Sequence, residues 1–271
     1  MARPEPTAAD KGTHFAALIK SAVTEPGVMS ECFKMFHRYS PWNVFWAMGQ
    51  AKHAGIEVGP ISTFKRWKAL GRTVKKGSKA IYMTMPRPKF VPDPDDPTKK
   101  IPAGQYFVNV PRWFFMSQTE GPDVEVETSE NVSWNKDQAL KALDIKEETF
   151  GLADGNCGGY AYCKGDKKGT IAVNPLHPHP YRIYFHEMAH VLMHSESETV
   201  KAEDRPPSNI RELEAELTAY ICAQTLDLDG AAQSRGYIQH WFKDKTVPET
   251  SAKAVCETAA KILSAGKEED K

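Results

Sequence analysis

Two histidines four residues apart, His186 and His190, stand on either side of Glu187. Residues at this spacing share one face of a helix, so both imidazoles can reach a single metal ion. The glutamate beside the first histidine can then take a proton from a metal-bound water. The residues flanking the motif are apolar, as a buried catalytic helix requires. The pattern predicts a zinc-dependent peptide-cleaving site with Glu187 as general base.

A catalytic zinc ion takes three protein ligands and leaves its fourth position to water, so another segment must supply the third ligand. A predicted helix over residues 209–226 carries Glu212 and Glu216 on one face. We assign Glu212 to the zinc and Glu216 to a hydrogen bond with a ligand histidine. On sequence grounds these two roles are exchangeable. The competing interpretation is that both carboxylates belong to a solvated helix face.

Zinc in such a site lowers the pKa of bound water from about 16 towards 7 and polarises the scissile carbonyl. The oxyanion that forms needs a further hydrogen-bond donor. The sequence offers four candidates and does not rank them: His194, Tyr220, His240 and Tyr160.

The bulk composition indicates a globular protein without a membrane partner. The 271 residues are 41% hydrophobic and 10% aromatic, which suffices for one large domain or two modest ones. No long apolar run and no apolar N-terminal segment is present, so a cytoplasmic location is expected. The five cysteines are scattered rather than arranged as a disulfide framework, and reduced thiols are expected.

The net charge of zero conceals a basic half joined to an acidic half. Residues 1–120 contain 18 Lys and Arg against 9 Asp and Glu, whereas the remainder contains 17 against 26. Such an asymmetry predicts that the first half meets a polyanion.

Periodicity and turn residues predict an α+β protein of two domains, over residues 1–120 and 136–271, with an acidic linker over 121–135. In the first domain, a strand is expected over 79–85. The proline-rich stretch 86–102 is expected to be a loop inserted in the sheet. The other expected elements are helices at 14–20, 33–54, 67–70, 137–143, 180–193, 209–226 and 251–265, a strand or strand pair at 105–116, and a hairpin over 161–173.

Between residues 59 and 92 there are nine Lys or Arg and no Asp or Glu. Such cations can follow a phosphate backbone, and interleaved aromatic side chains, among them Phe64, Trp67 and Tyr82, can stack on unpaired bases. Single-stranded DNA fits this combination better than duplex, because no helix-turn-helix or zinc-finger pattern is visible. The competing interpretation is a solvated lysine-rich surface with tryptophans in the core. The DNA-contacting candidates are Lys65, Arg66, Trp67, Lys68, Arg72, Lys75, Lys76 and Lys79.

Segments in both halves resemble the ArdC-type antirestriction proteins, in the same order along the chain. Residues 40–43, 63–67 and 74–80 resemble their N-terminal domain, and residues 186–194 and 212–217 resemble their metallopeptidase domain. The resemblance implies a single-stranded DNA-binding domain fused to a zincin-like peptidase domain, carried on mobile elements and protecting incoming DNA from host restriction. The insert at 86–102, and Glu214 at a typically apolar position, depart from the family pattern.

Three hypotheses follow. The first is a zinc peptidase recruited by single-stranded DNA, with an unidentified protein substrate. The second is a DNA-binding shield whose zincin module is catalytically silent, in which Glu187→Ala would leave antirestriction intact. The third is a repressor-cleaving regulatory metalloprotease without DNA affinity, in which a Lys75→Glu, Lys76→Glu change would alter no DNA binding.

Overall fold

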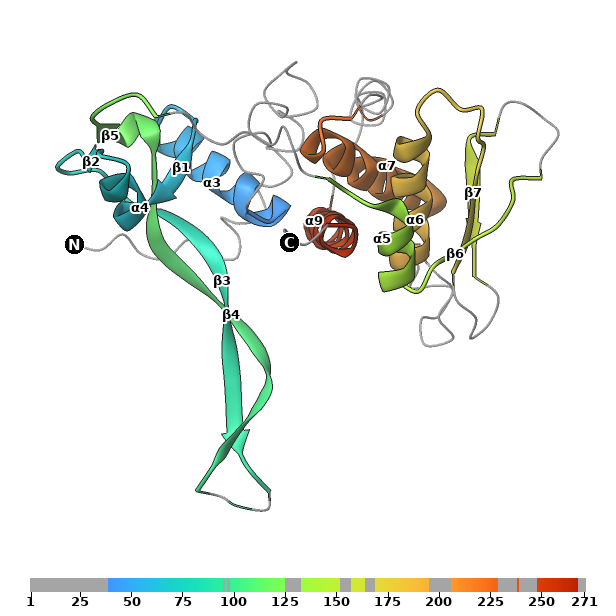
Figure 1. Cartoon of the computed structure of the whole chain (residues 1–271), viewed down its shortest axis with the longest axis horizontal. Coiled ribbons are helices and arrows are strands. Elements are labelled where there is room, and N and C mark those ends of the chain that lie inside the picture. The colour runs from blue at the N-terminus through green and yellow to red at the C-terminus, as the bar shows by residue number, and fades with distance from the viewer. Residues whose placement is uncertain are drawn as a thin grey trace. The chain divides into compact units, whose positions relative to one another are not determined.

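The computed structural model describes residues 39–94, 96, 98–124, 133–151, 157–163, 169–194, 206–228, 238 and 248–267. The chain divides into two compact units, one spanning Trp46–Val126 and the other containing Glu127–Lys271. Both combine helices with β-sheet, which confirms the expected α+β class (Figure 1). The helix expected at 14–20 lies outside the described residues, and the domain limits at 120 and 136 stay predictions. Among the described residues, no helix is long and apolar enough to cross a membrane.

The first unit is built on a three-stranded antiparallel sheet in the order β1-β4-β3. The end of β4 pairs with β1, and β4 pairs along its length with β3. A second antiparallel ladder joins β2 to β5. The elements are α3 (Pro41–Ala54), β1 (Ile61–Thr63), α4 (Phe64–Ala69), β2 (Thr73–Val74), β3 (Ile81–Pro92), β4 (Lys100–Phe115), the 3-10 turn η1 (Met116–Gln118) and β5 (Thr119–Glu120).

Side chains of α3 and α4 tie these helices to the sheet. Gln50 of α3 donates to the carbonyl of Tyr82 and accepts from its amide, both at 2.8 Å, as a strand residue would. Helix α4 begins after Thr63, whose hydroxyl caps the first turn. The indole of Trp67 is buried under α4 and donates to the carbonyl of Phe114 at 2.8 Å. Both helices are therefore anchored to β3 and β4 through partly buried hydrogen bonds.

Strands β3 and β4 form a long hairpin that extends beyond the rest of its unit (Figure 1). The long strand expected near 105–116 is confirmed, but the loop expected over 86–102 is wrong, because pairing continues to Pro92 and resumes at Lys100. Proline is accommodated in a strand where its missing N–H would face away from the partner. Beyond the short pairing with β1, this ribbon has an outer edge on both strands, so it tolerates prolines that a central strand would exclude.

The second unit packs helices against a three-stranded sheet in the order β6-β8-β7. Strand β6 runs parallel to β8 and β7 runs antiparallel to it. Helix α6 contacts β7 and β8 on one side and α7 on the other, and α7 in turn packs on α9. The elements are α5 (Lys136–Ala142), β6 (Lys146–Glu147), β7 (Gly159–Tyr162), β8 (Thr170–Val173), α6 (Pro180–His194), α7 (Ser208–Thr225) and α9 (Glu249–Ala265).

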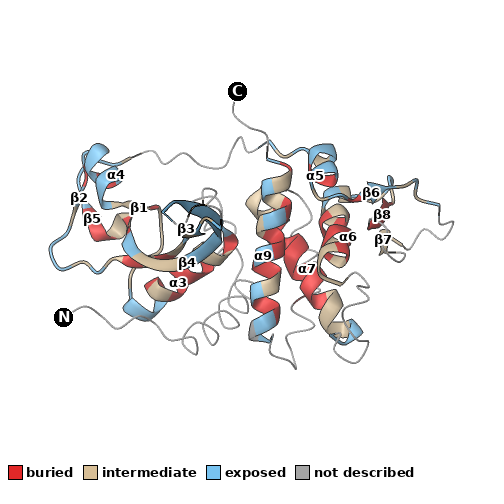
Figure 2. Ribbon diagram, turned by 90° about the horizontal axis from the view of Figure 1, so that it is seen from below, coloured by how far each residue is buried: buried red, intermediate tan, exposed pale blue. Residues whose placement is uncertain are grey.

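The helices of this unit differ in burial. Much of α7 is buried, whereas α9 alternates a buried face with an exposed one (Figure 2). The four helices predicted over residues 137–143, 180–193, 209–226 and 251–265 are confirmed within a few residues. The predicted hairpin is also confirmed as β7 and β8, although its turn at 164–168 lies outside the described residues.

The sheet approaches α6 so closely that two positions require glycine. A Cβ on Gly159 would lie 2.6 Å from Cγ2 of Ile183 and 3.2 Å from Cγ of Glu187. A Cβ on Gly169 would lie 2.1 Å from Cγ1 of Val191. The absence of these side chains lets β7 lie directly beside the glutamate of the histidine motif.

Candidate metal centre

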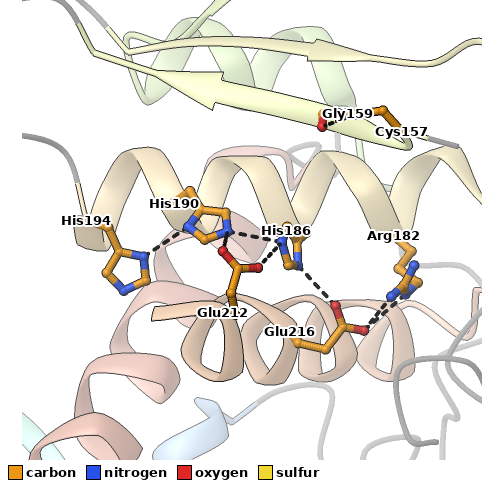
Figure 3. Close-up of polar contacts among 8 residues, drawn as sticks. All are labelled: Cys157, Gly159, Arg182, His186, His190, His194, Glu212 and Glu216. Carbon is orange, nitrogen blue, oxygen red and sulfur yellow. Dashed lines mark hydrogen bonds and ion pairs between the residues drawn. The ribbon is translucent and has the colours of Figure 1, made fainter. Parts of the chain in front are cut away.

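The structure brings the three predicted metal ligands together between α6 and α7 (Figure 3). One ring nitrogen each of His186 and His190 and one carboxylate oxygen of Glu212 lie within 4.8 Å of one another. The two carboxylate oxygens of Glu212 each stand 3.5 Å from one histidine Nε2, and the two Nε2 atoms are 3.0 Å apart. Two imidazoles and one carboxylate are the donor set of a catalytic zinc site with one open position.

Glu216 supports His186 from the side away from this cluster. Its Oε2 lies 3.0 Å from Nδ1 of His186, while its Oε1 accepts from the guanidinium of Arg182 at 2.6 Å and 3.2 Å. A carboxylate only accepts hydrogen bonds, so Nδ1 of His186 carries a hydrogen, and in the neutral imidazole Nε2 presents its lone pair to the cluster. The placement agrees with the roles assigned to Glu212 and Glu216 from sequence, and those roles stay predictions.

His190 is supported by a second pair of side chains, His194 and Glu214, to which no supporting role was predicted from sequence. Its Nδ1 lies 3.1 Å from Nδ1 of His194, and Nε2 of His194 lies 2.8 Å from Oε2 of Glu214. If Glu214 accepts from Nε2–H of His194, then Nδ1 of His194 accepts from His190. Nε2 of His190 is thereby left with its lone pair towards the cluster. His194 was a candidate oxyanion donor, but both of its ring nitrogens are engaged in this network.

The convergence of lone pairs makes the cluster suited to a cation. Two unprotonated Nε2 atoms at 3.0 Å repel each other unless a proton or a metal ion lies between them. Without a metal ion, a proton on Nε2 of His186 relieves this repulsion: burial lowers the pKa of His186, but hydrogen bonds to Glu212 and Glu216 outweigh burial and raise the pKa to about 9. The same hydrogen bonds from His186 and His190 hold the pKa of Glu212 well below its ordinary value.

Glu187 lies beside the two histidines and is almost completely buried. Burial raises the pKa of its carboxyl, against the opposing influence of His186 and His190. A raised pKa suits a carboxylate that takes up a proton and then releases it, because proton transfer is most efficient when the pKa of the base lies near the working pH.

A cavity of about 680 Å³ opens onto the cluster and is bordered by β7 and by the two helices. Arg211, which was not among the residues predicted from sequence, lines this cavity next to Glu212. Its Nε atom is buried and has no hydrogen-bond partner among the described residues. The only sequence signal for Arg211 was its position directly before Glu212. The described lining residues are Gly159, Ala161, Tyr162, Cys163, His186, Glu187, His190, Val191, His194, Arg211 and Glu212.

The candidate oxyanion donors Tyr160 and Tyr220 are not among the described residues that line the cavity. The hydroxyl of Tyr160 donates to Glu148 at 3.1 Å, and Tyr220 is buried within α7. His240 lies outside the described residues. Among the described residues that line the cavity, Arg211 carries the permanent positive charge.

Two of the eight predicted DNA-contacting residues require correction. Trp67 is 1% exposed under α4 and cannot stack on a base in this conformation. Arg72 is 7% exposed and is held by Thr119, whose hydroxyl accepts from Nε at 2.8 Å, and by the carbonyl of Gly121 at 3.1 Å. Both residues therefore stabilise the fold. The remaining six candidates are exposed: Lys65, Arg66, Lys68, Lys75, Lys76 and Lys79.

Comparison with known proteins finds a family match for the N-terminal part of the chain. Two solved structures that match are crystal structures of the antirestriction ArdC protein from plasmid R388. The metal-free form is 17% identical over 94% of each chain, with a TM-score of 0.46. The Mn(II)-bound form is 19% identical over 94% of this chain and 95% of that chain, with a TM-score of 0.46. No curated protein sequence matches. Residues 19–112 match the family model for the N-terminal domain of anti-restriction factor ArdC.

Proposed function

We propose that the protein is a zinc-dependent peptidase whose catalytic unit is joined to a domain that binds single-stranded DNA. One observation carries the peptidase: His186, His190 and Glu212 converge beside the buried carboxyl of Glu187 at the wall of a cavity. The donor set fits zinc, and each histidine is held on its outer side by a hydrogen bond that directs Nε2 to the cluster.

The residues around the cluster have distinct roles in this proposal. Zinc held by the three ligands would supply a water of lowered pKa and a polarised carbonyl. Glu187 takes the proton of the attacking water and passes it to the leaving amine. Arg211 donates to the oxygen on which negative charge develops, because this residue lines the same cavity. Strand β7 borders the cavity, with no strand paired on its outer side among the described residues, and can align an extended peptide.

The peptidase is tested with purified protein stripped by chelation and reloaded with zinc, and the matched variant is Glu187→Gln. We expect casein fragments or self-cleavage products from the wild type with zinc only. The Glu187→Gln variant should bind one equivalent of zinc and cut nothing, whereas His190→Ala should lose the metal. Equal cleavage by wild type and Glu187→Gln would refute the mechanism. Intact substrate in every lane, with zinc bound, would favour the silent-module hypothesis.

The DNA-binding function rests on a different observation. Six exposed cations between residues 65 and 79 lie in a domain that matches the N-terminal domain of anti-restriction factor ArdC. Such a surface follows phosphates, and its affinity falls steeply with salt. We propose that the protein protects incoming DNA from restriction by binding it in single-stranded form.

Plasmid transfer into a restricting host tests this protection. Lys75→Glu with Lys76→Glu should abolish protection, since the reversal adds repulsion to the lost phosphate contacts. If the Glu187→Gln variant still protects the plasmid, protection depends on DNA binding alone. If the variant does not protect, protection depends on proteolysis. Protection that is unchanged by the lysine reversal would refute the DNA-binding part and favour a regulatory protease.

A further inference from the structure

The half of the β3–β4 hairpin that extends from its unit carries exposed aromatic side chains. We call residues 86–92 of β3 and 100–107 of β4 the arm. Phe107 is 69% exposed, and Tyr106 and Phe90 are each 52% exposed. Large aromatic side chains contribute most of their stabilisation when buried, so a group of them held in solvent on one ribbon indicates an interaction surface.

The pairing register places these aromatic residues beside cations and prolines on both faces. Tyr106 lies opposite Arg87, and Phe107 lies opposite Pro86. Directly opposed residues of an antiparallel pair share a face, and successive pairs alternate between faces. The arm therefore presents Tyr106 with Arg87 on one face and Phe107 with Pro86 on the other. Lys89 follows at the register shift between Pro88 and Phe90.

The charge of the ribbon identifies the kind of partner. Strands β3 and β4 contain no Asp or Glu, and their four cations are all exposed: Arg87, Lys89, Lys100 and Arg112. The cations are complementary to a polyanion, and the aromatic rings offer flat apolar faces. Unpaired bases on a phosphate backbone satisfy both features at once.

We propose that the arm binds single-stranded nucleic acid on both of its faces, with Tyr106 on one face and Phe107 on the other against bases, and with Arg87 and Lys89 against phosphates. The inference rests on the proposed DNA-binding function. It assigns the contacts with bases to Tyr106 and Phe107 of the arm. The tryptophans Trp46, Trp67 and Trp113 are buried, so they are unavailable for stacking. The lysines at 75, 76 and 79 supply charge, and the arm supplies the rings.

A second copy of the chain is the main alternative occupant of a ribbon with an outer edge on each strand. Edge-to-edge pairing needs a run of backbone N–H groups along that edge. The arm carries prolines at 86, 88, 92 and 102, and each removes one such group. Proline therefore makes the arm a poor template for strand addition while leaving its side chains free to bind.

Fluorescence anisotropy with a labelled oligothymidine of about 20 nucleotides tests the arm. Against the full-length wild type, the Tyr106→Ala, Phe107→Ala variant should bind at least about tenfold more weakly, because each base stacked on an aromatic ring contributes substantially. Its salt dependence should be unchanged, since no phosphate contact is lost. Arg87→Ala with Lys89→Ala should instead reduce the slope of affinity against salt concentration by about two phosphate contacts.

A gain-of-signal variant keeps the test independent of folding defects. In Phe107→Trp the added fluorescence of the new indole should be quenched by the oligonucleotide. Thermal melting of each variant checks that the domain is folded. An unchanged affinity in the double alanine variant, with no quenching in Phe107→Trp, would refute nucleic-acid binding by the arm. The proposed DNA binding by the protein would remain intact. Absence of any oligothymidine binding by the wild type would overturn both.

Sedimentation velocity addresses the alternative occupant. We expect the wild type and the Tyr106→Ala, Phe107→Ala variant to sediment as the same species. A wild-type dimer that the double variant dissociates would overturn the inference in favour of a second copy of the chain.

Discussion

Nε2 of His194 lies 2.8 Å from Oε2 of Glu214, and the two side chains are only 4% and 6% exposed. The pair stands directly behind His190, whose Nδ1 is 3.1 Å from the imidazole of His194. Glu216 holds His186 in a comparable way from the same helix. Two carboxylates of α7 thus fix the orientation and tautomer of the two histidines of α6, one directly and one through a further imidazole.

Removal of the charge at Glu214 should weaken metal binding without removing a metal ligand. In Glu214→Gln the amide can present an N–H to His194, so the tautomer of His190 is no longer fixed. We expect zinc affinity to fall roughly 10- to 100-fold, as for other groups that support a ligand histidine. Competition with a chromophoric chelator measures the affinity, and Glu212→Gln, which removes a ligand, sets the lower reference. Wild-type affinity in a folded Glu214→Gln protein would contradict the role of the pair.

Arg211 should affect the chemical step rather than the metal. Loss of a donor to the oxyanion typically costs on the order of 10²–10³ in kcat. Arg211→Met should show a decrease of this order with zinc content unchanged, and Arg211→Lys should recover part of the activity. Turnover of a peptide that the wild type cleaves, measured beside metal content, checks the prediction. Arg211→Met with normal kcat would restrict Arg211 to a structural role.

Gly159 should be intolerant of any side chain. An alanine Cβ would lie 2.6 Å from Ile183 and 2.8 Å from the carbonyl oxygen of Ala172, and that backbone oxygen cannot move aside alone. Gly159→Ala should lower the free energy of unfolding by about 1–3 kcal/mol, as overpacking does. The matched control is Gly151→Ala, because a Cβ there meets no described residue within 4 Å. Denaturant unfolding compares the two, and equal stability would show that β7 can shift away from α6.

The pH dependence of the zinc-free protein should follow His186. Its pKa is raised from 6.5 to about 9, so the stability it contributes is complete below pH 6.5 and is lost as pH rises through about 9. The pKa of Glu212 is lowered from 4.5, so its contribution is present above pH 4.5 and is lost on acidification below that value. Thermal melting in chelator should therefore show greatest stability near pH 4.5–6.5.

Added zinc should reverse the alkaline part of this profile. Zinc competes with the proton on the histidines, so the increase in melting temperature caused by zinc should grow from pH 6 to pH 8. His186→Gln serves as the control, because it removes both the proton and the ligand. If the increase in melting temperature caused by zinc is the same at every pH in the wild type, zinc and the proton do not compete for His186.

Local spacing along the chain was sufficient to predict much of the candidate site. The interval from His186 to His190 and the interval from Glu212 to Glu216 each return to one helix face after four residues, whatever the rest of the fold does. Strong apolar periodicity likewise predicted α6, α7 and α9 within a few residues.

Residues with the same local signals were separated only by tertiary contacts. Lys68 and Arg72 belong to one cationic run, yet Lys68 is exposed and Arg72 is buried against Thr119, which lies 47 positions away in the sequence. Trp67 has the composition of a base-stacking residue, but the carbonyl of Phe114 and the sheet around it enclose the indole. Charge and aromaticity predicted a binding surface, and burial determined which residues are available to it.

The arm and the Glu214–His194 pair were decided by the tertiary structure alone. The prolines at 86–102 predicted a loop, because strand propensity takes no account of whether a strand lies at an edge. In a two-stranded ribbon each strand has an outer edge, where proline is tolerated. The helical period places Glu214 on a different face of α7 from Glu212. Glu214 supports His194 only because α7 packs on α6 at the level of that histidine. The sequence alone determines which residues share a face of one helix or strand, because the backbone geometry of that element fixes their spacing. Pairing and burial depend on segments distant in sequence, and only the packed fold brings those together.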